Sequence, residues 1–297
     1  MAMVFFARVV ELRSFTAAAA KLGVSKSVVS ARVAAFERRL RVPLLHRTTR
    51  KLSLTREGLA LYERCARVAA AADDAAATAD RTGDAPHGVL RVDAPIVFAE
   101  ERLAAPVASY LAANPGVRIA LTMSDRMIDL IEEGVDVAIR ITSQLVGAGL
   151  VARKLGVDRT VLCASPAYLA RKGTPASPDD LAGHDCLLYS LVKSADEWRF
   201  RTGKRSFSVP IEARFSAASG AVLRRAALAG MGLAVLPRFM IAADLDAGRL
   251  RPVVDSFEGV ALGIYAVYPQ PQGGGRPSPK LRAFVDLLVA HFRAHPV

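Results

Sequence analysis

Short hydroxyl and basic side chains gather between residues 25 and 32 of this 297-residue chain. They are Ser25, Lys26, Ser27, Ser30 and Arg32. Serine, lysine and arginine side chains donate hydrogen bonds to phosphate oxygens and to base edges in the major groove of DNA. The chemistry that these residue types favour is therefore recognition of duplex DNA.

A helix-turn-helix is the element that the sequence predicts for positioning these side chains. Phe15, Ala19 and Leu22 recur at helical spacing, and Gly23 can adopt the left-handed conformation that ends a helix. Ser25 can cap the helix that follows. The apolar stripe of this second helix is expected to pack inward and consists of Val29, Val33, Phe36 and Leu40.

A small hairpin is predicted for residues 43–55, with basic residues around its turn. Arg47, Arg50 and Lys51 are suited to phosphates or to the adjacent minor groove. The alternative is a hairpin exposed to solvent. Thr55 can cap a long helix over residues 56–82 and is also counted among the DNA contacts.

The positive charge of the chain is concentrated at its N-terminal end. The first 60 residues hold 12 lysines and arginines against three glutamates, so they carry +9 of the total charge of +12. A localised positive field is expected where a protein binds phosphate backbones. An alanine-rich helical bundle without a DNA role would leave this asymmetry unexplained.

From residue 89 the sequence alternates between strand and helix patterns, which indicates α/β layers. Strands are predicted at residues 89–93, 117–123, 136–141, 160–164, 211–216, 233–236 and 263–268. Helices are predicted at residues 101–113, 129–133, 166–171, 221–229 and 279–294.

Residues 6–57 resemble the winged helix-turn-helix of LysR-type transcriptional regulators in three runs, SFTAAAAKLGVS, SKSVVSARVAAFERRL and VPLLHRTTRKLSLTREG. The later chain resembles the effector domain of the same family in LAAPVASYLAANPGVRIAL, LIEEGVDVAIRI, VLCASPAYLARKG and AALAGMGLAVLP. In that family the effector domain has a two-lobed α/β fold similar to periplasmic solute-binding proteins. The resemblance therefore covers nearly the whole chain.

The resemblance implies a mixed fold class with three parts. Residues 1–57 would form the all-α winged helix-turn-helix, and residues 58–88 a linker and dimerisation helix with a hinge. Residues 89–297 would form a type 2 periplasmic-binding-protein-like domain. Its lobe 1 would take residues 89–159 and 264–297, and its lobe 2 residues 160–263.

Family resemblance also places the effector-facing positions of this domain. They are Pro95, Ile96, Val97, Ser124, Arg140, Ser190 and Ser219. Hydroxyls and free backbone donors at helix N-termini favour an anionic group, so a small organic acid is the expected effector. The alternatives are that Ser124 and Ser219 cap helices and that Arg140 forms a structural salt bridge.

An enzyme and a solute-binding transport component are the alternatives to a regulator. The sequence does not favour an enzyme. Its Gly230-Met231-Gly232 run has Val235 where a dinucleotide-binding fingerprint needs a third glycine, and its five histidines lack the spacing of metal ligands. No catalytic residue, metal or cofactor is therefore expected. A solute-binding transport component would share the C-terminal fold but would require export. Three cysteines without CxxC spacing indicate reduced, buried or inert thiols.

The expected partners are promoter or operator DNA and a small-molecule effector, with RNA polymerase as a further partner that the resemblance allows. The chain is expected in the cytoplasm without membrane contact, as a homodimer or homotetramer. A roughly heptad-like course along the long helix favours pairing and runs through Leu59, Tyr62, Ala66, Ala69 or Ala70 and Asp73. Three positions depart from common family residues: Ala31 stands in place of arginine, and Arg13 and Arg41 in place of glycine.

Overall fold

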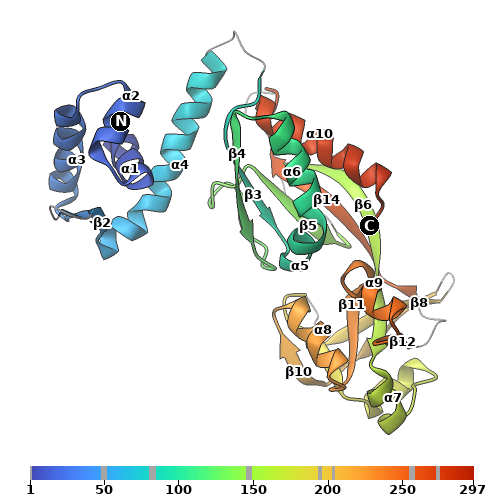
Figure 1. The fold of residues 1–297 in the computed structure, drawn as a ribbon. Helices are drawn as coiled ribbons and strands as arrows, with labels where there is room; N and C mark the ends of the chain where they lie inside the picture. Colours follow the sequence, from blue (N-terminus) through green and yellow to red (C-terminus); the bar gives the residue numbers. More distant parts are fainter. Residues whose placement is uncertain are drawn as a thin grey trace. The chain divides into compact units, whose positions relative to one another are not determined.

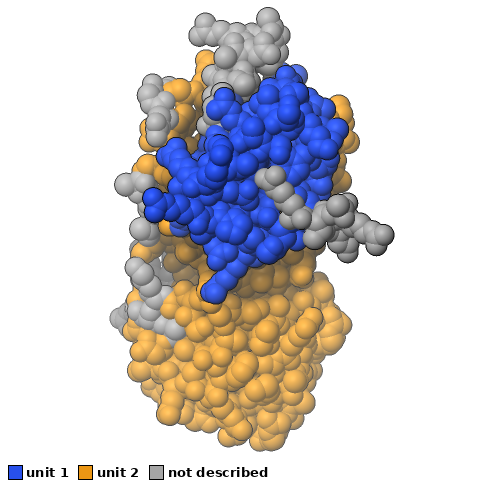
Figure 2. Space-filling model, turned by 90° about the vertical axis from the view of Figure 1, so that its left-hand side faces the viewer, with its two compact units in different colours: residues 1–88 blue, residues 89–297 orange. Residues whose placement is uncertain are grey.

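The computed structural model describes residues 2–47, 52–79, 85–144, 149–192, 196–202, 205–253, 258–271 and 275–297. The chain forms two compact units, unit 1 (residues 1–88) and unit 2 (residues 89–297), which Figure 2 shows in different colours. None of the helices in these ranges is both long and apolar enough to cross a lipid bilayer.

Unit 1 is a helical domain with a short hairpin (Figure 1). Its elements are α1 (Ala2–Leu12), α2 (Phe15–Leu22), α3 (Lys26–Leu40), β1 (Leu45–Arg47), β2 (Leu52–Leu54) and α4 (Arg56–Ala79). β1 and β2 pair antiparallel, with Leu45 opposite Leu54. The predicted helix-turn-helix and hairpin are thus confirmed. The core of the unit includes Val29, Val33 and the rings of Phe6 and Phe36, whose centroids lie 6.2 Å apart.

The corner between α2 and α3 has the geometry that the sequence predicts. Gly23 adopts φ +65°, and its backbone N–H reaches the carbonyl oxygens of Ala19 and Ala20. The hydroxyl of Ser25 then accepts a hydrogen bond from the backbone N–H of Val28 at 3.4 Å. A left-handed glycine followed by a serine cap ends one helix and starts the next within three residues.

One expectation about buried faces is wrong, and one alternative is decided. Leu40, predicted on the buried stripe of α3, is 39% exposed, because it is the last residue of the helix. Of the alternatives Ala69 and Ala70 for the pairing face of α4, Ala69 is 1% exposed and belongs to the same core as Phe6, which leaves Ala70. α4 packs against α1 of its own chain, and this contact buries the side of α4 that carries Ala69.

Two arginines of unit 1 adopt the left-handed backbone conformation. Arg13 lies between α1 and α2 with φ 48°, and Arg41 ends α3 with φ 57°. For a residue with a β-carbon this conformation costs about 1–2 kcal/mol, because Cβ lies too close to the following carbonyl oxygen. At both positions the family resemblance led to an expectation of glycine, which adopts this conformation without the strain.

Replacing Arg41 by glycine is expected to stabilise unit 1. The backbone strain disappears, while the extra freedom of glycine in the unfolded chain offsets part of the gain, so a net increase of roughly 0.5–1 kcal/mol is expected. Amide hydrogen exchange of α3 would measure this gain. Arg39→Gly is the matched control and should destabilise by about 1 kcal/mol, because Arg39 lies within the right-handed α3. A loss of protection in Arg41→Gly would contradict the prediction.

Unit 2 is an α/β structure that runs from the end of unit 1 to the C-terminus (Figure 1). Its first elements are β3 (Gly88–Ala94), α5 (Ile96–Phe98), the π-helix η1 (Ala99–Leu103), α6 (Ala104–Ala113), β4 (Val117–Met123), β5 (Val137–Thr142), β6 (Leu150–Ala164), α7 (Pro166–Lys172) and the 3-10 helix η2 (Pro178–Gly183). The others are β7 (Cys186–Tyr189), β8 (Glu197–Thr202), β9 (Arg205–Pro210), β10 (Ala213–Ala217), α8 (Gly220–Leu228), β11 (Leu233–Pro237), α9 (Arg238–Asp246), β12 (Arg251–Pro252), β13 (Glu258–Gly259), β14 (Ala261–Pro269) and α10 (Pro279–Ala294).

One sheet passes through the whole of unit 2. Its strands lie in the order β10-β7-β11-β6-β14-β5-β3-β4, with β12 paired to β6. β6 pairs antiparallel with β14 as far as Arg159 and with β11 from Thr160 onward. The change of partner occurs within one strand, so β6 belongs to both parts of the sheet. β8, β9 and β13 form a separate three-stranded sheet.

The hydrophobic core of unit 2 is continuous across this change of partner. Phe98 of α5 packs edge-on against Phe239 of α9, with ring centroids 5.6 Å apart. It also packs at 5.6 Å against Phe292 of α10. Since Phe239 lies in the part of the chain predicted as lobe 2, the two predicted lobes share one core.

Several predicted elements of unit 2 are corrected. Residues 129–133 form hydrogen-bonded turns in place of the predicted helix, because the Asp129 carboxylate accepts hydrogen bonds from the backbone N–H groups of Ile131 and Glu132. The first ten residues of β6 were not predicted as strand. Strands β7, β8, β9, β12 and β13 and the helices α5, η2 and α9 were also missed.

The three cysteines are free and buried, as the sequence predicted. Burial raises the pKa of Cys65 to about 11. Burial, helped by the charge of Asp244, raises the pKa of Cys163 to about 12. Burial and then the charge of Asp185 raise the pKa of Cys186 to about 12. A thiol with such a pKa stays protonated near neutral pH and is a poor nucleophile.

Candidate nucleic-acid interface and ligand cleft

The outer face of α3 carries the predicted DNA contacts. Lys26, Ser27 and Arg32 are exposed, and Ser30 is half-buried. Val29 and Val33 on the opposite face are fully buried. Lys26 and Arg32 form no ion pair or hydrogen bond with the described part of the chain, so both cations are free for phosphates.

The hydroxyl groups at the start of α3 are coupled. The Ser25 and Ser27 hydroxyl oxygens lie 2.8 Å apart, within hydrogen-bond distance. Because the Ser25 oxygen also accepts from Val28, its main role in the free protein is to cap the helix. Ser27 is then the hydroxyl of this pair that is better placed to reach outward.

The hairpin is attached to α3 by a residue that the sequence did not single out. One carboxylate oxygen of Glu37, Oε1, accepts hydrogen bonds from the backbone N–H groups of Leu44 at 2.8 Å and Leu45 at 3.1 Å. Hydrogen bonds to a charged acceptor are among the stronger ones in proteins. Glu37 therefore sets where β1 begins relative to α3. An acidic residue within the strongly basic first 60 residues was the available signal.

Thr55 is corrected from a DNA contact to a structural residue. It is 5% exposed, its hydroxyl donates to the carbonyl oxygen of Pro43 at 2.8 Å, and it accepts from the backbone N–H of Gly58 at 2.9 Å. The hydroxyl is thus fully used inside the domain as the cap of α4. For Arg47 the structure describes only the backbone, and Arg50 and Lys51 lie outside the described residues.

In unit 2 the first group of predicted effector positions is brought together at the ends of β3 and β4. Pro95, Ile96 and Val97 follow β3, and the backbone N–H of Ser124 donates to the carbonyl oxygen of Ala94 at 3.0 Å. The Ser124 hydroxyl accepts from the backbone N–H of Arg126, so it closes a local turn. Asp125, which the sequence reasoning missed, accepts from the backbone N–H of Ile96 at 3.1 Å.

The second group lies at the ends of β7 and β10. The backbone N–H of Ser190 donates to the carbonyl oxygen of Ala217 at 3.0 Å, two residues before Ser219. Ser219 is the N-terminal flanking residue of α8, but its side chain makes no capping hydrogen bond. Burial, and then the nearby charge of Asp125, raise the pKa of Tyr189.

Arg140 is held inside its own sheet. It is 7% exposed, and its Nη1 donates to Asp93 Oδ2 at 2.7 Å. Among the described residues, Nη2 of Arg140 and Oδ1 of Asp93 are buried without a hydrogen-bond partner. Burial raises the pKa of Asp93, and the hydrogen bond and charge of Arg140 oppose that rise. The structural salt bridge is therefore present, with one arginine nitrogen left over.

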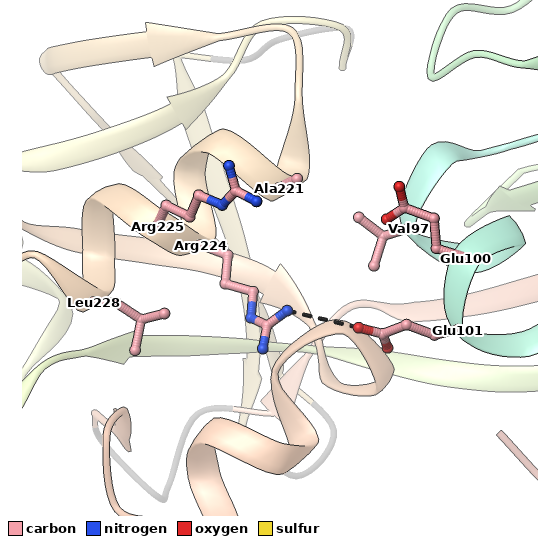
Figure 3. Close-up of a pocket in the computed structure, with 7 residues that line it drawn as sticks. All are labelled: Val97, Glu100, Glu101, Ala221, Arg224, Arg225 and Leu228. Atoms are coloured by element: carbon pink, nitrogen blue, oxygen red, sulfur yellow. Dashed lines mark ion pairs between the residues drawn. The ribbon is translucent and has the colours of Figure 1, made fainter.

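A cavity of about 250 Å³ lies where α5 and η1 face α8 (Figure 3). Its lining residues are Val97, Glu100, Glu101, Ala221, Arg224, Arg225 and Leu228. Only Val97 belongs to the predicted effector positions. Groups of three or more histidine, cysteine or acidic residues that could hold a metal ion are absent from the described part of the chain.

Comparison with protein families gives two matches along the chain. Residues 2–59 match the family described as "Bacterial regulatory helix-turn-helix protein, lysR family". Residues 83–293 match the family described as "LysR substrate binding domain". The second match alone covers more than half of the chain.

Individual relatives align over nearly the full length. The chain is 36% identical to the HTH-type transcriptional regulator CrgA of Neisseria meningitidis serogroup C over 285 residues, which cover 96% of this chain and 94% of CrgA. It is 31% identical to the regulator DmlR of Escherichia coli, covering 98% of this chain and 93% of DmlR.

Solved structures agree with this assignment. The structure of CrgA, a LysR-type transcriptional regulator from Neisseria meningitidis, matches with a TM-score of 0.61 and 35% identity over 98% of this chain and 97% of the other. The full-length Vibrio cholerae virulence activator AphB matches with a TM-score of 0.61 and 26% identity over 97% of this chain and 98% of AphB.

Proposed function

The chain belongs to the LysR family of bacterial transcriptional regulators, and from that premise we propose that α3 reads operator DNA under the control of a small organic acid bound in unit 2. A member of this family is a DNA-binding regulator with an effector-binding domain and not an enzyme. Its DNA partner makes the cytoplasm its place of action.

The exposed front of α3 is the observation that carries the DNA-binding part of the proposal. Lys26, Ser27 and Arg32 stand on a helix whose back is anchored by Val29 and Val33. In this proposal Ser27 and Ser30 meet base edges, Lys26 meets bases and nearby phosphates, Arg32 meets phosphates, and Ser25 orients the helix. The remaining proposed contacts, all to the DNA backbone, are Arg47, Arg50 and Lys51.

Arg32→Ala is expected to weaken binding to specific and random duplexes alike, by roughly five- to tenfold. It should also reduce the slope of the logarithm of the association constant against the logarithm of the salt concentration by about one, because a phosphate contact is lost.

Ser30→Ala should mainly lower the ratio of the affinities for operator and random DNA, by about fivefold, because a base contact of about 1 kcal/mol is lost. Fluorescence anisotropy with an operator fragment and a scrambled duplex would measure both. Arg282→Ala, an exposed arginine of unit 2, is the matched control.

The proposal is overturned if neither variant changes affinity or discrimination on any duplex. Equal losses of discrimination from both variants would instead show that the roles of Arg32 and Ser30 are assigned wrongly. Ala31 is exposed and cannot donate a hydrogen bond from its side chain, so base readout is expected from its neighbours.

Pairing of two chains through α4 is the proposed assembly, as a homodimer or a pair of homodimers. Two recognition helices on successive major grooves require at least a dimer. In support, Leu59 is 61% exposed and Val68 is 42% exposed on α4 within one chain. RNA polymerase is a proposed further partner at the promoter.

The proposed effector site lies between the turn after β3 and the ends of β7 and β10. Ser190 and Ser219 have hydroxyl groups that are not used within the described residues, and Arg140 keeps one buried nitrogen without a partner. These donors support a ligand that carries a carboxylate. Pro95, Ile96, Val97 and Ser124 would supply the facing wall.

A further inference from the structure

The cavity between η1 and α8 is lined by charges of both signs, taken from opposite sides. Glu100 and Glu101 come from η1, whereas Arg224 and Arg225 come from α8. Val97, Ala221 and Leu228 supply the apolar part of the lining. None of the four charged residues belongs to the proposed DNA contacts or effector positions, although Val97 is shared with the proposed effector site.

One arginine and one glutamate of the lining already form a pair. Arg224 Nη1 lies 3.6 Å from Glu101 Oε1 (Figure 3). Arg224 is also fixed from behind, because its Nε donates to Oδ2 of Asp244 at 2.6 Å, and Asp244 is 1% exposed. This side of the cavity is therefore a fixed wall with its charges compensated.

The other arginine and glutamate are not paired. The side chains of Arg225 and Glu100 form no ion pair or hydrogen bond with any described residue. Figure 3 shows the Arg225 guanidinium and the Glu100 carboxylate both directed into the space between the two helices. The cavity thus presents one free cation from α8 and one free anion from η1, with apolar residues on both sides.

We propose that this cavity binds a small zwitterion of the α-amino acid class, with its carboxylate on Arg225 and its ammonium group on Glu100. A carboxylate and an ammonium group a few ångströms apart complement the two free charges at once. A simple acid would meet Glu100 as a like charge, and a simple amine would meet Arg225 in the same way. Val97, Ala221 and Leu228 would contact a small aliphatic side chain.

The size of the cavity agrees with this class. A water molecule takes ~30 Å³ in the liquid and a covalently bonded non-hydrogen atom takes less, so about 250 Å³ has room for a molecule of at least roughly eight such atoms. L-Threonine has this size. Because both free charges are exposed, each ion pair contributes modestly, and a dissociation constant of roughly 0.1–1 mM is expected.

The test is a calorimetric titration of the full chain with L-threonine, in parallel with a plain acid (butyrate) and a plain amine (butylamine). The wild type should bind L-threonine at least about tenfold more tightly than either single-charge compound. Equal or weaker binding of L-threonine would overturn the proposal.

Two neutral variants then locate the binding. Glu100→Gln should remove the preference for L-threonine over butyrate, and Arg225→Gln should remove the preference over butylamine. Both residues are exposed, so neither change is expected to unfold the chain. Glu133→Gln and Arg282→Gln, also exposed and unpaired within the described residues, are the charge-matched controls and should bind L-threonine like the wild type.

The outcome separates this inference from the proposed function. If DNA binding persists and organic acids bind while L-threonine does not, this inference is overturned and the regulator stands. If L-threonine binds with unchanged preference in both variants, its site lies elsewhere and the assignment to Glu100 and Arg225 is wrong. Loss of DNA binding by the wild type would contradict the proposed function alone.

Discussion

Replacing Phe98 with alanine is expected to destabilise unit 2 by roughly 3–5 kcal/mol. The ring is fully buried (0% exposed) and packs against Phe239 on one side and Phe292 on the other, both at 5.6 Å between centroids. Truncation removes the apolar contact, leaves a cavity and loses two aromatic pairs. Urea unfolding followed by the fluorescence of Trp198, the one tryptophan of the chain, would report unit 2 selectively.

Phe98→Leu is the matched control, because leucine keeps most of the volume and should cost much less than alanine. Since the core is shared between the two predicted lobes, both should unfold in one transition in the wild type and in the leucine variant. A loss below about 1 kcal/mol in Phe98→Ala would show that the ring does not join the two parts of the core as the distances suggest.

Replacing Asp244 with alanine is expected to cost roughly 2–4 kcal/mol. Its carboxylate accepts from Arg224 Nε at 2.6 Å and from Arg249 Nε at 2.8 Å. Removing the buried carboxylate takes from both guanidinium groups their shortest hydrogen bonds and leaves Arg224, within the described residues, with only its 3.6 Å pair to Glu101, which is costly for partly buried charges. This expected loss of stability lies below the range for fully buried pairs, because the side chain of Arg249 is 54% exposed and can be solvated by water instead.

The same residue predicts a dependence on pH. Burial alone would raise the pKa of Asp244, but the hydrogen bonds from Arg224 and Arg249 lower it further, so the net pKa lies below its ordinary value of 3.8. A lowered pKa in the folded state stabilises the protein above pH 3.8, and this contribution is lost as the pH falls through the folded-state pKa. Asp244→Asn should therefore lose less stability on acidification than the wild type. Identical acid profiles would contradict this account.

Unit 1 could be predicted from sequence because its signals are local. Gly23, Ser25 and Thr55 each determine a helix end through their own backbone or hydroxyl, and the observed caps are those predicted. The errors in unit 1 concern tertiary packing. Ala69 is buried because α1 lies against it, which the pattern within α4 could not reveal.

Unit 2 was predicted less completely, because strand formation depends on partners distant in sequence. The first part of β6 mixes apolar with charged residues without regular alternation, and it becomes a strand through its ladder with β14, more than a hundred residues later. In residues 129–133 the helical pattern was outweighed by the Asp129 side chain, which bonds its neighbours in a turn.

The sequence predicted the kinds of site and the exposed residues of α3, but it did not predict the residues that act across different elements. The exposed positions of α3 follow from helical periodicity, so their orientation could be predicted. Glu37, Asp125 and the four charged residues of the cavity became visible only in three dimensions, because each acts on groups outside its own element.

The π-helix η1 interrupts what would otherwise be one regular helix from α5 to α6. A π turn accommodates one residue more than an α turn, so deleting a single residue there would let the segment wind normally. Everything before the deletion would then rotate by about 100° relative to α6. Glu100 and Glu101 would then no longer face Arg224 and Arg225, and the zwitterion would lose its binding site although all four charged side chains were retained. The number of residues in η1 therefore sets where the two glutamates lie relative to α8.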